Sequence, residues 1–422
     1  MTRSGRHTHP GGATLAAACC LLLLNATACR DEAVGIGDPT ADAAILDGSA
    51  PSPDSAVDER CADWQPAPGE LQVWNSTSGV GERHAAAAVG RAGIALVVWA
   101  TDDGVWGRAR CASGAPLLEG GLDTRLDDGG ASSLSGPYVR ALQDGRFVVT
   151  WRDDTDASIR AVWLDALGAR SGPVVKINTE ETAAQGRPPR VVQLADGDLV
   201  FFWREVFRSF SVDGEPRDTD WDFFDETFKT LDAAAGANGQ LLQLRDGAHN
   251  AGTAIVLGLR SYSYTVAGGV EFSLGCIVWP HLFNWGRRGF VLASEPDAGR
   301  AAVLWPGNYP YEIWLRWVGA DGVTEGDAFA LGAGGDDIGV DGWMDLAIDG
   351  LGETLAVWRT ADAAGEIHTW TEQDEDQVLM LDWGELPHFP RLAGFPDGGF
   401  LLLMTPDESH PDEEVLFMTI GR

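Results

Sequence analysis

A glycine followed six residues later by a large hydrophobic residue recurs along this 422-residue chain. The glycines are Gly93, Gly145, Gly197, Gly299, Gly352 and Gly398, and their anchors are Trp99, Trp151, Trp203, Trp305, Trp358 and Met404. A degenerate copy, Asp246-Gly247 followed by Leu257, fills the gap in the series. The anchors are then 52, 52, 54, 48, 53 and 46 residues apart. A near-constant period in this range is the sequence signature of a repeat protein.

One repeat predicts a small antiparallel sheet. In the second copy, residues 138–142 and 147–152 are rich in β-branched and aromatic residues, and Asp144-Gly145 joins them. This pattern indicates a hairpin, because glycine tolerates the positive φ of a twist-matched turn. Residues 159–164 and 173–177 add two more strands. Four strands in about 52 residues, without a helical period, exclude helical solenoids and favour a seven-bladed β-propeller over a flat β-sandwich.

The propeller prediction fixes two further expectations. Each anchor should fill the wedge between neighbouring four-stranded antiparallel blades, where it is withdrawn from water. The final copy offers three strands, at residues 389–393, 399–404 and 414–420, and the chain stops one strand short of a full blade. We therefore expect residues 71–74 to pair with the last strand and close the ring, because this pairing removes exposed strand edges.

The repeat resembles those of seven-bladed propellers in secreted and surface proteins of Gram-negative bacteria, where a Leu-x-Asp-Gly hairpin runs into Val-Val-x-Trp. Residues 142–151 carry this pattern most clearly, and the resemblance covers residues 70–422. The resemblance implies the architecture. It implies little about function, because such propellers serve many unrelated roles.

The N-terminal segment predicts export. Arg3 and Arg6 precede an apolar stretch at residues 13–24, and small residues at 26–28 precede Cys29. We interpret residues 1–28 as a signal peptide, too short to span a bilayer. The cysteine resembles the lipidated cysteine of bacterial lipoproteins, with plain secretion as the alternative. By the same resemblance, Arg30 after the cysteine favours the outer membrane over the inner one.

The residues after Cys29 predict a tether. Residues 30–60 are rich in Asp, Ala, Pro, Ser and Gly and contain no aromatic residue, so they cannot bury enough apolar area to fold. The predicted organisation is a lipidated cysteine and acidic tether at 29–60, then a monomeric propeller domain at 61–422. Of the three cysteines in that domain, Cys61 and Cys111 are the favoured disulfide, and Cys276 in an apolar run is expected to stay reduced.

Charge excludes some partners. The chain carries 63 acidic and 30 basic residues, and its net charge is −33. Such a surface repels phosphate backbones, so we do not expect nucleic-acid binding. The acidic surface keeps an exported domain soluble; the alternative role is attraction of cations, notably Ca²⁺.

Motifs for metal or nucleophilic chemistry are missing from the sequence. It contains no Cys-x-x-Cys, no His-Glu-x-x-His and no Gly-x-Ser-x-Gly. Asp153-Asp154-Thr155-Asp156 and Asp102-Asp103 resemble oxygen-rich Ca²⁺ loops, but acidic hairpin turns explain them more simply. We therefore predict no cofactor and no metal site, and we leave weak Ca²⁺ binding open.

Aromatic residues depart from the repeat in its third to fifth copies. Beside turn formers and acidic residues stand Trp221, Phe223, Trp285, Tyr309 and Tyr311. Exposed rings with polar neighbours suit sugars or peptides; the alternative is that these rings pack the outer strands of imperfect blades. The leading hypothesis is a non-catalytic envelope lipoprotein that binds a protein or a glycan. A propeller hydrolase or lyase acting on polysaccharide and a structural envelope protein remain the alternatives.

Overall fold

A computed structural model describes most of the predicted domain. The described residues are 61, 72–74, 83–91, 93–111, 117, 123–129, 134–179, 189–203, 206–217, 221–222, 228–235, 241–247, 255–260, 291–294, 300–306, 312–319, 324–333, 344–359, 366–373, 377–380, 388–406 and 415–421. They all belong to the second of two compact units, residues 53–422. The predicted signal peptide, Cys29, the tether and Cys276 lie outside the described residues. Over the part described, no helix is long and apolar enough to cross a membrane.

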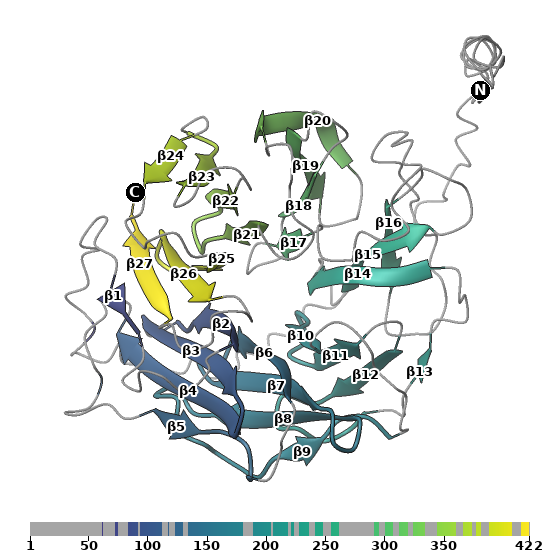
Figure 1. The fold of residues 1–422 in the computed structure, drawn as a ribbon. Coiled ribbons are helices and arrows are strands. Elements are labelled where there is room, and N and C mark those ends of the chain that lie inside the picture. Colours follow the sequence, from purple (N-terminus) through teal and green to yellow (C-terminus); the bar gives the residue numbers. More distant parts are fainter. Residues whose placement is uncertain are drawn as a thin grey trace, which may run out of the picture. The chain divides into compact units, whose positions relative to one another are not determined.

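The described residues form an all-β structure of seven antiparallel sheets, which we name in chain order (Figure 1). Sheet B holds β2 (Arg83–Val89), β3 (Ile94–Thr101), β4 (Gly104–Cys111) and β5 (Thr124–Arg125). Sheet C holds β6 (Leu134–Ala141), β7 (Phe147–Asp153), β8 (Ser158–Leu164) and β9 (Val175–Lys176). Sheet D holds β10 (Arg190–Gln193), β11 (Leu199–Trp203), β12 (Val206–Phe210) and β13 (Trp221–Asp222).

The second half of the chain repeats this meander. Sheet E holds β14 (Phe228–Ala235), β15 (Leu241–Gly247) and β16 (Ile255–Arg260). Sheet F holds β17 (Val291–Ser294), β18 (Arg300–Pro306), β19 (Glu312–Gly319) and β20 (Thr324–Ala333). Sheet G holds β21 (Met344–Ile348), β22 (Thr354–Arg359), β23 (Glu366–Thr371) and β24 (Gln377–Met380). Sheet A holds β25 (His388–Gly394), β26 (Phe400–Pro406), β27 (Leu416–Ile420) and, from the start of the domain, β1 (Gln72–Val73).

The repeat glycines sit in the turns between first and second strands. Where they are described, their φ angles are positive, at 68° for Gly93, 88° for Gly145, 91° for Gly197, 82° for Gly352 and 105° for Gly398. In sheet C the Gly145 N–H donates to Leu142 O, and the Leu142 N–H donates to Arg146 O. This is a three-residue hairpin loop whose left-handed residue is the glycine. The sequence therefore predicts the hairpin and its glycine. The structure adds that Asp144, which precedes the glycine, does not have a positive φ.

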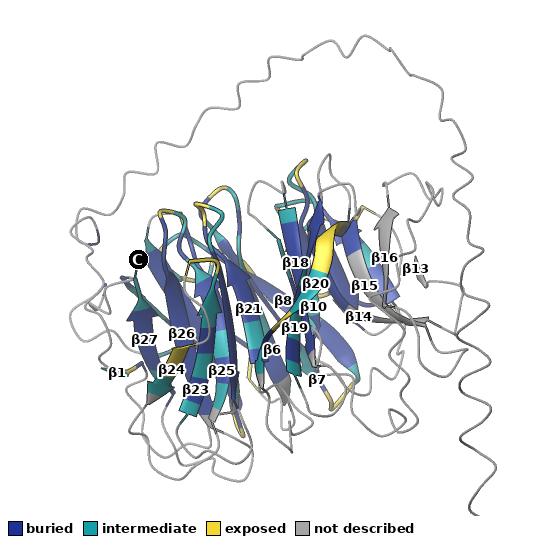
Figure 2. Cartoon of the chain, turned by 90° about the horizontal axis from the view of Figure 1, so that it is seen from above, coloured by how far each residue is buried: buried dark blue, intermediate teal, exposed yellow. Residues whose placement is uncertain are grey.

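The anchors are almost fully buried on the second strands. Their exposed fractions are 1% for Trp99, 0% for Trp151, 1% for Trp203, 2% for Trp305, 1% for Trp358 and 0% for Met404. Trp151 of sheet C packs with Val98 and Val105 of sheet B, and the other anchors likewise pack against the sheet that precedes them. Figure 2 shows buried residues running along the strands, with exposed residues gathered at turns and on β20. The anchors thus join consecutive sheets, as the sequence predicts.

The degenerate seventh copy was placed wrongly. Gly247 ends the second strand of sheet E, opposite Phe228, and does not open its hairpin. Leu257 lies in the third strand, opposite Leu244. The first hairpin of this sheet falls between Ala235 and Leu241, so it precedes the Asp-Gly pair that the sequence analysis assigned to it. An Asp-Gly pair also suits the end of a strand, so the dipeptide alone does not fix the phase of a repeat.

Residues 72–74 bring the start of the domain onto its last strand. Gln72 pairs with Phe417 and Val73 with Leu416, which is the pairing that the sequence predicts. Trp74 follows and is fully buried. Its backbone N–H donates to Val415 O at 2.9 Å, and its indole packs edge-on against Phe417, with ring centroids 4.6 Å apart.

Trp74 also contacts sheet B. Its indole Nε1–H donates to Arg108 O at 3.1 Å, and Arg110 Nη2 donates to Trp74 O at 2.6 Å. The structure joins Cys61 and Cys111 in a disulfide, the pair that the sequence favours, so the residue that opens the domain is bound to the end of β4. The same short segment therefore contacts sheets A and B, whose first strands β25 and β2 are also in contact.

Mutation should affect the tryptophans unequally. Trp151→Ala and Trp203→Ala should each lower the free energy of unfolding by about 3–5 kcal/mol, because each truncates a packed aromatic side chain. Trp221→Ala, outside the repeat pattern, should cost far less. Urea unfolding of the three variants measures these losses, and equal losses at all three positions would make Trp221 a core residue.

Candidate functional site

The predicted aromatic ligand surface falls mostly outside the described residues. Phe223, Trp285, Tyr309 and Tyr311 are not described. Trp221 begins the outer strand β13 and pairs with Phe207. The proposal that these five rings form one ligand surface therefore stays a prediction.

The acidic turn at residues 153–156 is compensated by arginines. Arg160 Nη2 lies 3.0 Å from carboxylate oxygens of both Asp153 and Asp156, and Arg152 pairs with Asp154 at 2.6 Å. Asp153 Oδ1 also accepts the backbone N–H of Thr155 at 3.0 Å. Over the described ranges, no group of three or more His, Cys, Asp or Glu residues is placed to hold a metal ion. These contacts favour an acidic hairpin turn over a Ca²⁺ loop.

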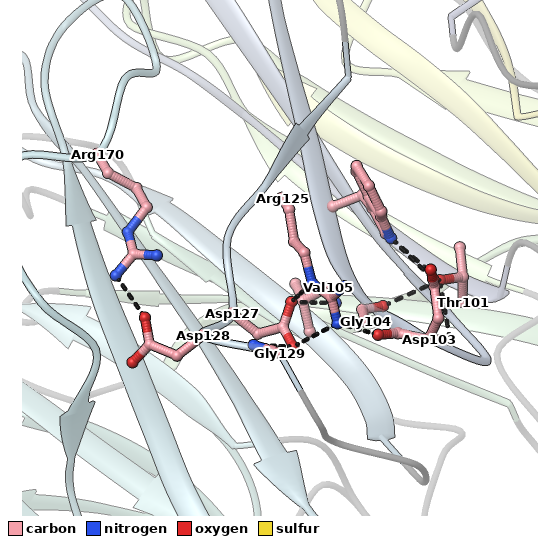
Figure 3. A network of polar contacts seen from close by, with 10 residues as sticks. Thr101, Asp103, Gly104, Val105, Arg125, Asp127, Asp128, Gly129 and Arg170 are labelled. Atoms are coloured by element: carbon pink, nitrogen blue, oxygen red, sulfur yellow. Dashed lines mark hydrogen bonds and ion pairs between the residues drawn. The ribbon is translucent and has the colours of Figure 1, made fainter.

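The second acidic turn belongs to a polar network in sheet B (Figure 3). Asp103 accepts a hydrogen bond from Thr101 Oγ1 at 2.5 Å, and Arg125 donates to the Asp103 carbonyl. Arg125 Nε also pairs with Asp127 at 2.7 Å, and Asp127 accepts the Gly129 N–H at 3.1 Å. Asp127, only 6% exposed, thus fixes the loop after β5. We interpret this network as structural.

A different set of polar residues emerges from the strand register. In six sheets, the second-strand residue that immediately precedes the anchor pairs with one residue of the first strand. In sheet E, which has no anchor, the equivalent second-strand residue is Leu244, and it pairs with Asp232. We call the seven first-strand partners the first-strand layer. They are Ala86, Tyr138, Arg190, Asp232, Val291, Asp345 and Arg391. Because first strands of consecutive sheets are in contact, these equivalent positions lie at one level of the fold.

Two aspartates of the layer make the same bonds. Asp232 Oδ1 accepts the N–H of the next residue, Ala233, at 2.9 Å, and its Oδ2 accepts the Leu292 N–H of sheet F at 3.0 Å. Asp345 Oδ1 accepts the Leu346 N–H at 3.0 Å, and its Oδ2 accepts the Leu392 N–H of sheet A at 2.8 Å. Each carboxylate therefore fastens its own first strand to the first strand of the following sheet.

Arg190, the layer residue of sheet D, contacts the layer residues of both neighbouring sheets. Its Nη1 pairs with Asp232 Oδ1 of sheet E, and its guanidinium carbon lies 5.6 Å from the ring centroid of Tyr138 on sheet C. Asp232 is only 1% exposed, whereas the Arg190 side chain is 30% exposed. Over the described residues, Asp232 is the one side chain that accepts a hydrogen bond from Arg190. Arg190 is thus held on two sides and still open to solvent.

Charges interact across the layer. Burial raises the pKa of Asp345, while Arg391 and the two backbone N–H groups oppose that rise. Burial lowers the pKa of Arg190, but Asp232, Tyr138 and, more weakly, Asp345 raise it, so that the net shift is upward. Arg190 therefore stays charged. Electrostatic interactions therefore link Tyr138, Arg190, Asp232, Asp345 and Arg391, which lie on sheets C, D, E, G and A.

His84 stands beside this layer in a strained backbone. Its φ is +54°, uncommon for a residue other than glycine, and the register of β2 shifts between Arg83 and Ala86. A Cβ added to Gly136 of β6 would lie 2.4 Å from the His84 Cβ, so a glycine is required there. Strain of this kind clusters at functional sites, although it also accompanies bulges without chemistry.

Sequence reasoning missed the first-strand layer. The signal that identifies it is positional, because in the six sheets with an anchor the layer residue precedes that anchor by a nearly constant interval. The interval is 13 residues for Ala86, Tyr138, Arg190, Asp345 and Arg391 and 14 residues for Val291. The side chains themselves differ, from alanine to arginine, so no repeated motif is visible. The pairing of charges between sheets becomes apparent only from the register.

Comparisons with known proteins identify the fold class. No family model matches the chain, and no curated protein matches its sequence. A streptogramin B lyase structure aligns with a TM-score of 0.51 over 83% of this chain and 98% of that chain, at 10% identity. The Neurospora crassa Pan2 WD40 domain gives 0.47 over 83% and 94%, at 10% identity, and polysaccharide lyase Uly1 gives 0.47 over 86% and 94%, at 9% identity. The chain therefore has a β-propeller-type fold, and identities this low carry no activity across.

The contributions of Asp345 and Asp103 to the free energy of unfolding should change with pH in opposite directions. The raised pKa of Asp345 means that its charge penalises the folded state, so wild-type stability relative to Asp345→Asn should rise as pH falls through that pKa toward about 4. The hydrogen bond from Thr101 lowers the pKa of Asp103, so its contribution should be present above pH of about 4 and lost below it, relative to Asp103→Asn. Denaturant unfolding at a series of pH values from about 7 down to about 3 measures both differences. Parallel trends for the two pairs would contradict the assignment.

Proposed function

We propose that the protein is a seven-bladed β-propeller whose blades close into a ring. The seven sheets support this proposal, as do the contacts between consecutive first strands, which run from β2 through β21 to β25 and back to β2. The pairing of β1 with β27 supplies the fourth strand of sheet A. Sheet E has three strands among the described residues.

The N-terminal sequence supports a cell-envelope lipoprotein. Cys29 would carry the lipid, and residues 30–60 would be a tether between the outer membrane and the domain. A lipidated N-terminus with more than one acyl chain anchors stably, since each buried methylene contributes about 0.8 kcal/mol. Mass spectrometry of the mature N-terminus tests the anchor, and an unmodified cysteine would leave plain secretion.

The propeller would act as a non-catalytic module that binds a protein or a glycan. The first-strand layer is the observation that carries this proposal. Its two aspartates are occupied by backbone N–H groups, whereas Arg190 is rigidly held and 30% exposed. A charged group that is pre-positioned and open loses little entropy when it binds a ligand. The predicted aromatic surface would extend this site.

A glycan and peptide array with the purified domain tests the proposed function, together with turnover assays on every ligand that binds. We expect specific binding without change to the ligand, and Arg190→Gln should reduce binding. Release of product at an enzyme-like rate would contradict the non-catalytic proposal. Equal binding by wild type and Arg190→Gln would place the binding site elsewhere.

A second candidate function is polysaccharide lyase activity. The observation that favours it is the placement of His84, Tyr138 and Arg190 on the first strands of three consecutive sheets, with His84 strained. An arginine that neutralises a carboxylate makes the adjacent C–H more acidic, and a histidine or tyrosine is a suitable general base for removing that proton. Ultraviolet absorbance of an unsaturated product would reveal this elimination. Loss of that activity in His84→Ala and Tyr138→Phe, with binding retained, would assign it to these residues.

A further inference from the structure

The first-strand layer contains an arginine whose ligand class follows from its surroundings. Arg190 is fixed by Asp232 through one nitrogen and flanked by the Tyr138 ring, and it remains 30% exposed. Asp232 already accepts the Ala233 and Leu292 N–H groups, so its negative charge is shared among three donors. The guanidinium is therefore incompletely neutralised by its partner. The N–H groups that Asp232 does not use can bind a planar anion in a bidentate manner.

Neighbouring positions extend this basic surface. Arg140 lies two residues after Tyr138 on β6, so the two side chains are on the same face of the strand. Val139, between them, is on the other face and packs against sheet B. Arg140 and Tyr138 are both half-buried. At the level of Arg140, the equivalent residues of the other described first strands are alanine or valine: Ala88, Val192, Ala234, Ala293, Ala347 and Ala393. The small neighbours leave Arg140 as the charged residue of that level within the described strands.

We infer that the Arg190 region binds the carboxylate of an acidic sugar, as in a uronate-containing oligosaccharide. A uronate combines a planar carboxylate with a ring bearing hydroxyl groups, which suits a guanidinium beside a tyrosine. General electrostatics oppose this ligand, because the protein carries a net charge of −33. Binding must then come from the local geometry at Arg190. This inference rests on the proposed binding function and names its ligand class.

The test compares charged and uncharged sugars of one length. Oligogalacturonate and the matching galactose oligosaccharide are titrated into the full domain by calorimetry. We expect the acidic sugar to bind at least about tenfold more tightly, as loss of one charge-assisted bidentate contact implies. A peptide ending in a free carboxylate is titrated in parallel. Equal affinities for the two sugars, or binding of the peptide alone, would overturn the inference.

Variants assign the contact to Arg190. Arg190→Lys keeps the charge opposite Asp232 but loses the fork, and it should weaken oligogalacturonate binding at least about tenfold while the melting temperature stays near that of wild type. Arg170→Lys is the matched control, because Arg170 is 29% exposed and pairs with Asp128 outside the layer. Undiminished affinity in Arg190→Lys would refute the site.

A folding defect is separated from a binding defect. If Arg190→Lys does not fold, Arg190→Gln keeps a neutral N–H donor opposite Asp232 and leaves the two backbone hydrogen bonds of that carboxylate in place, so it should fold and fail to bind the acidic sugar. If the array finds a ligand that binds independently of both the carboxylate and Arg190, the proposed function stands and this inference fails. If wild type binds no sugar in either titration, the inference fails as well.

Discussion

Packing between neighbouring sheets is the constraint on which the rest of this structure depends. The second strands are buried on both faces, as the exposures of Val97, Val98 and Trp99 near zero illustrate. A sheet of this kind needs a neighbour on each side, since either face left open would expose a large apolar area. The anchors meet this need between consecutive sheets. Between the last sheet and the first, Trp74 meets it by packing with Trp99 of sheet B and Phe417 of sheet A.

Much of the fold could be predicted from the sequence, because its decisive signals are local and repeated. A glycine with positive φ and a buried anchor mark the first hairpins of sheets A, B, C, D and G, as at Gly145 and Trp151. The phase of sheet E was wrong because Asp246-Gly247 can end a strand as readily as open one. In a repeat without an anchor, the sequence does not show which residues pair. The register of such a repeat is known only from the structure.

The candidate site could not be predicted in the same way. Arg190 and Asp232 are 42 residues apart, and their contact depends on the packing of sheet D against sheet E. Sequence reasoning looked instead for motifs and exposed rings, and its aromatic candidates lie mostly outside the described residues. The layer also shows how one position serves two roles. Asp345 fastens two strands, whereas Arg190 is fastened by its partner and keeps an open side. Under the proposed function, this supported position would keep Arg190 pre-organised for its ligand.

The central claim is that residues 72–74 hold the last sheet against the first. Hydrogen exchange of wild type and Trp74→Ala, followed by mass spectrometry of peptides from each sheet, tests it most directly. The account predicts faster exchange in β2–β4 and in β25–β27 of the variant, with β7, β8 and β11 still protected, because opening begins between sheets A and B. Unchanged protection in sheets A and B, or a uniform loss across all sheets, would contradict the claim.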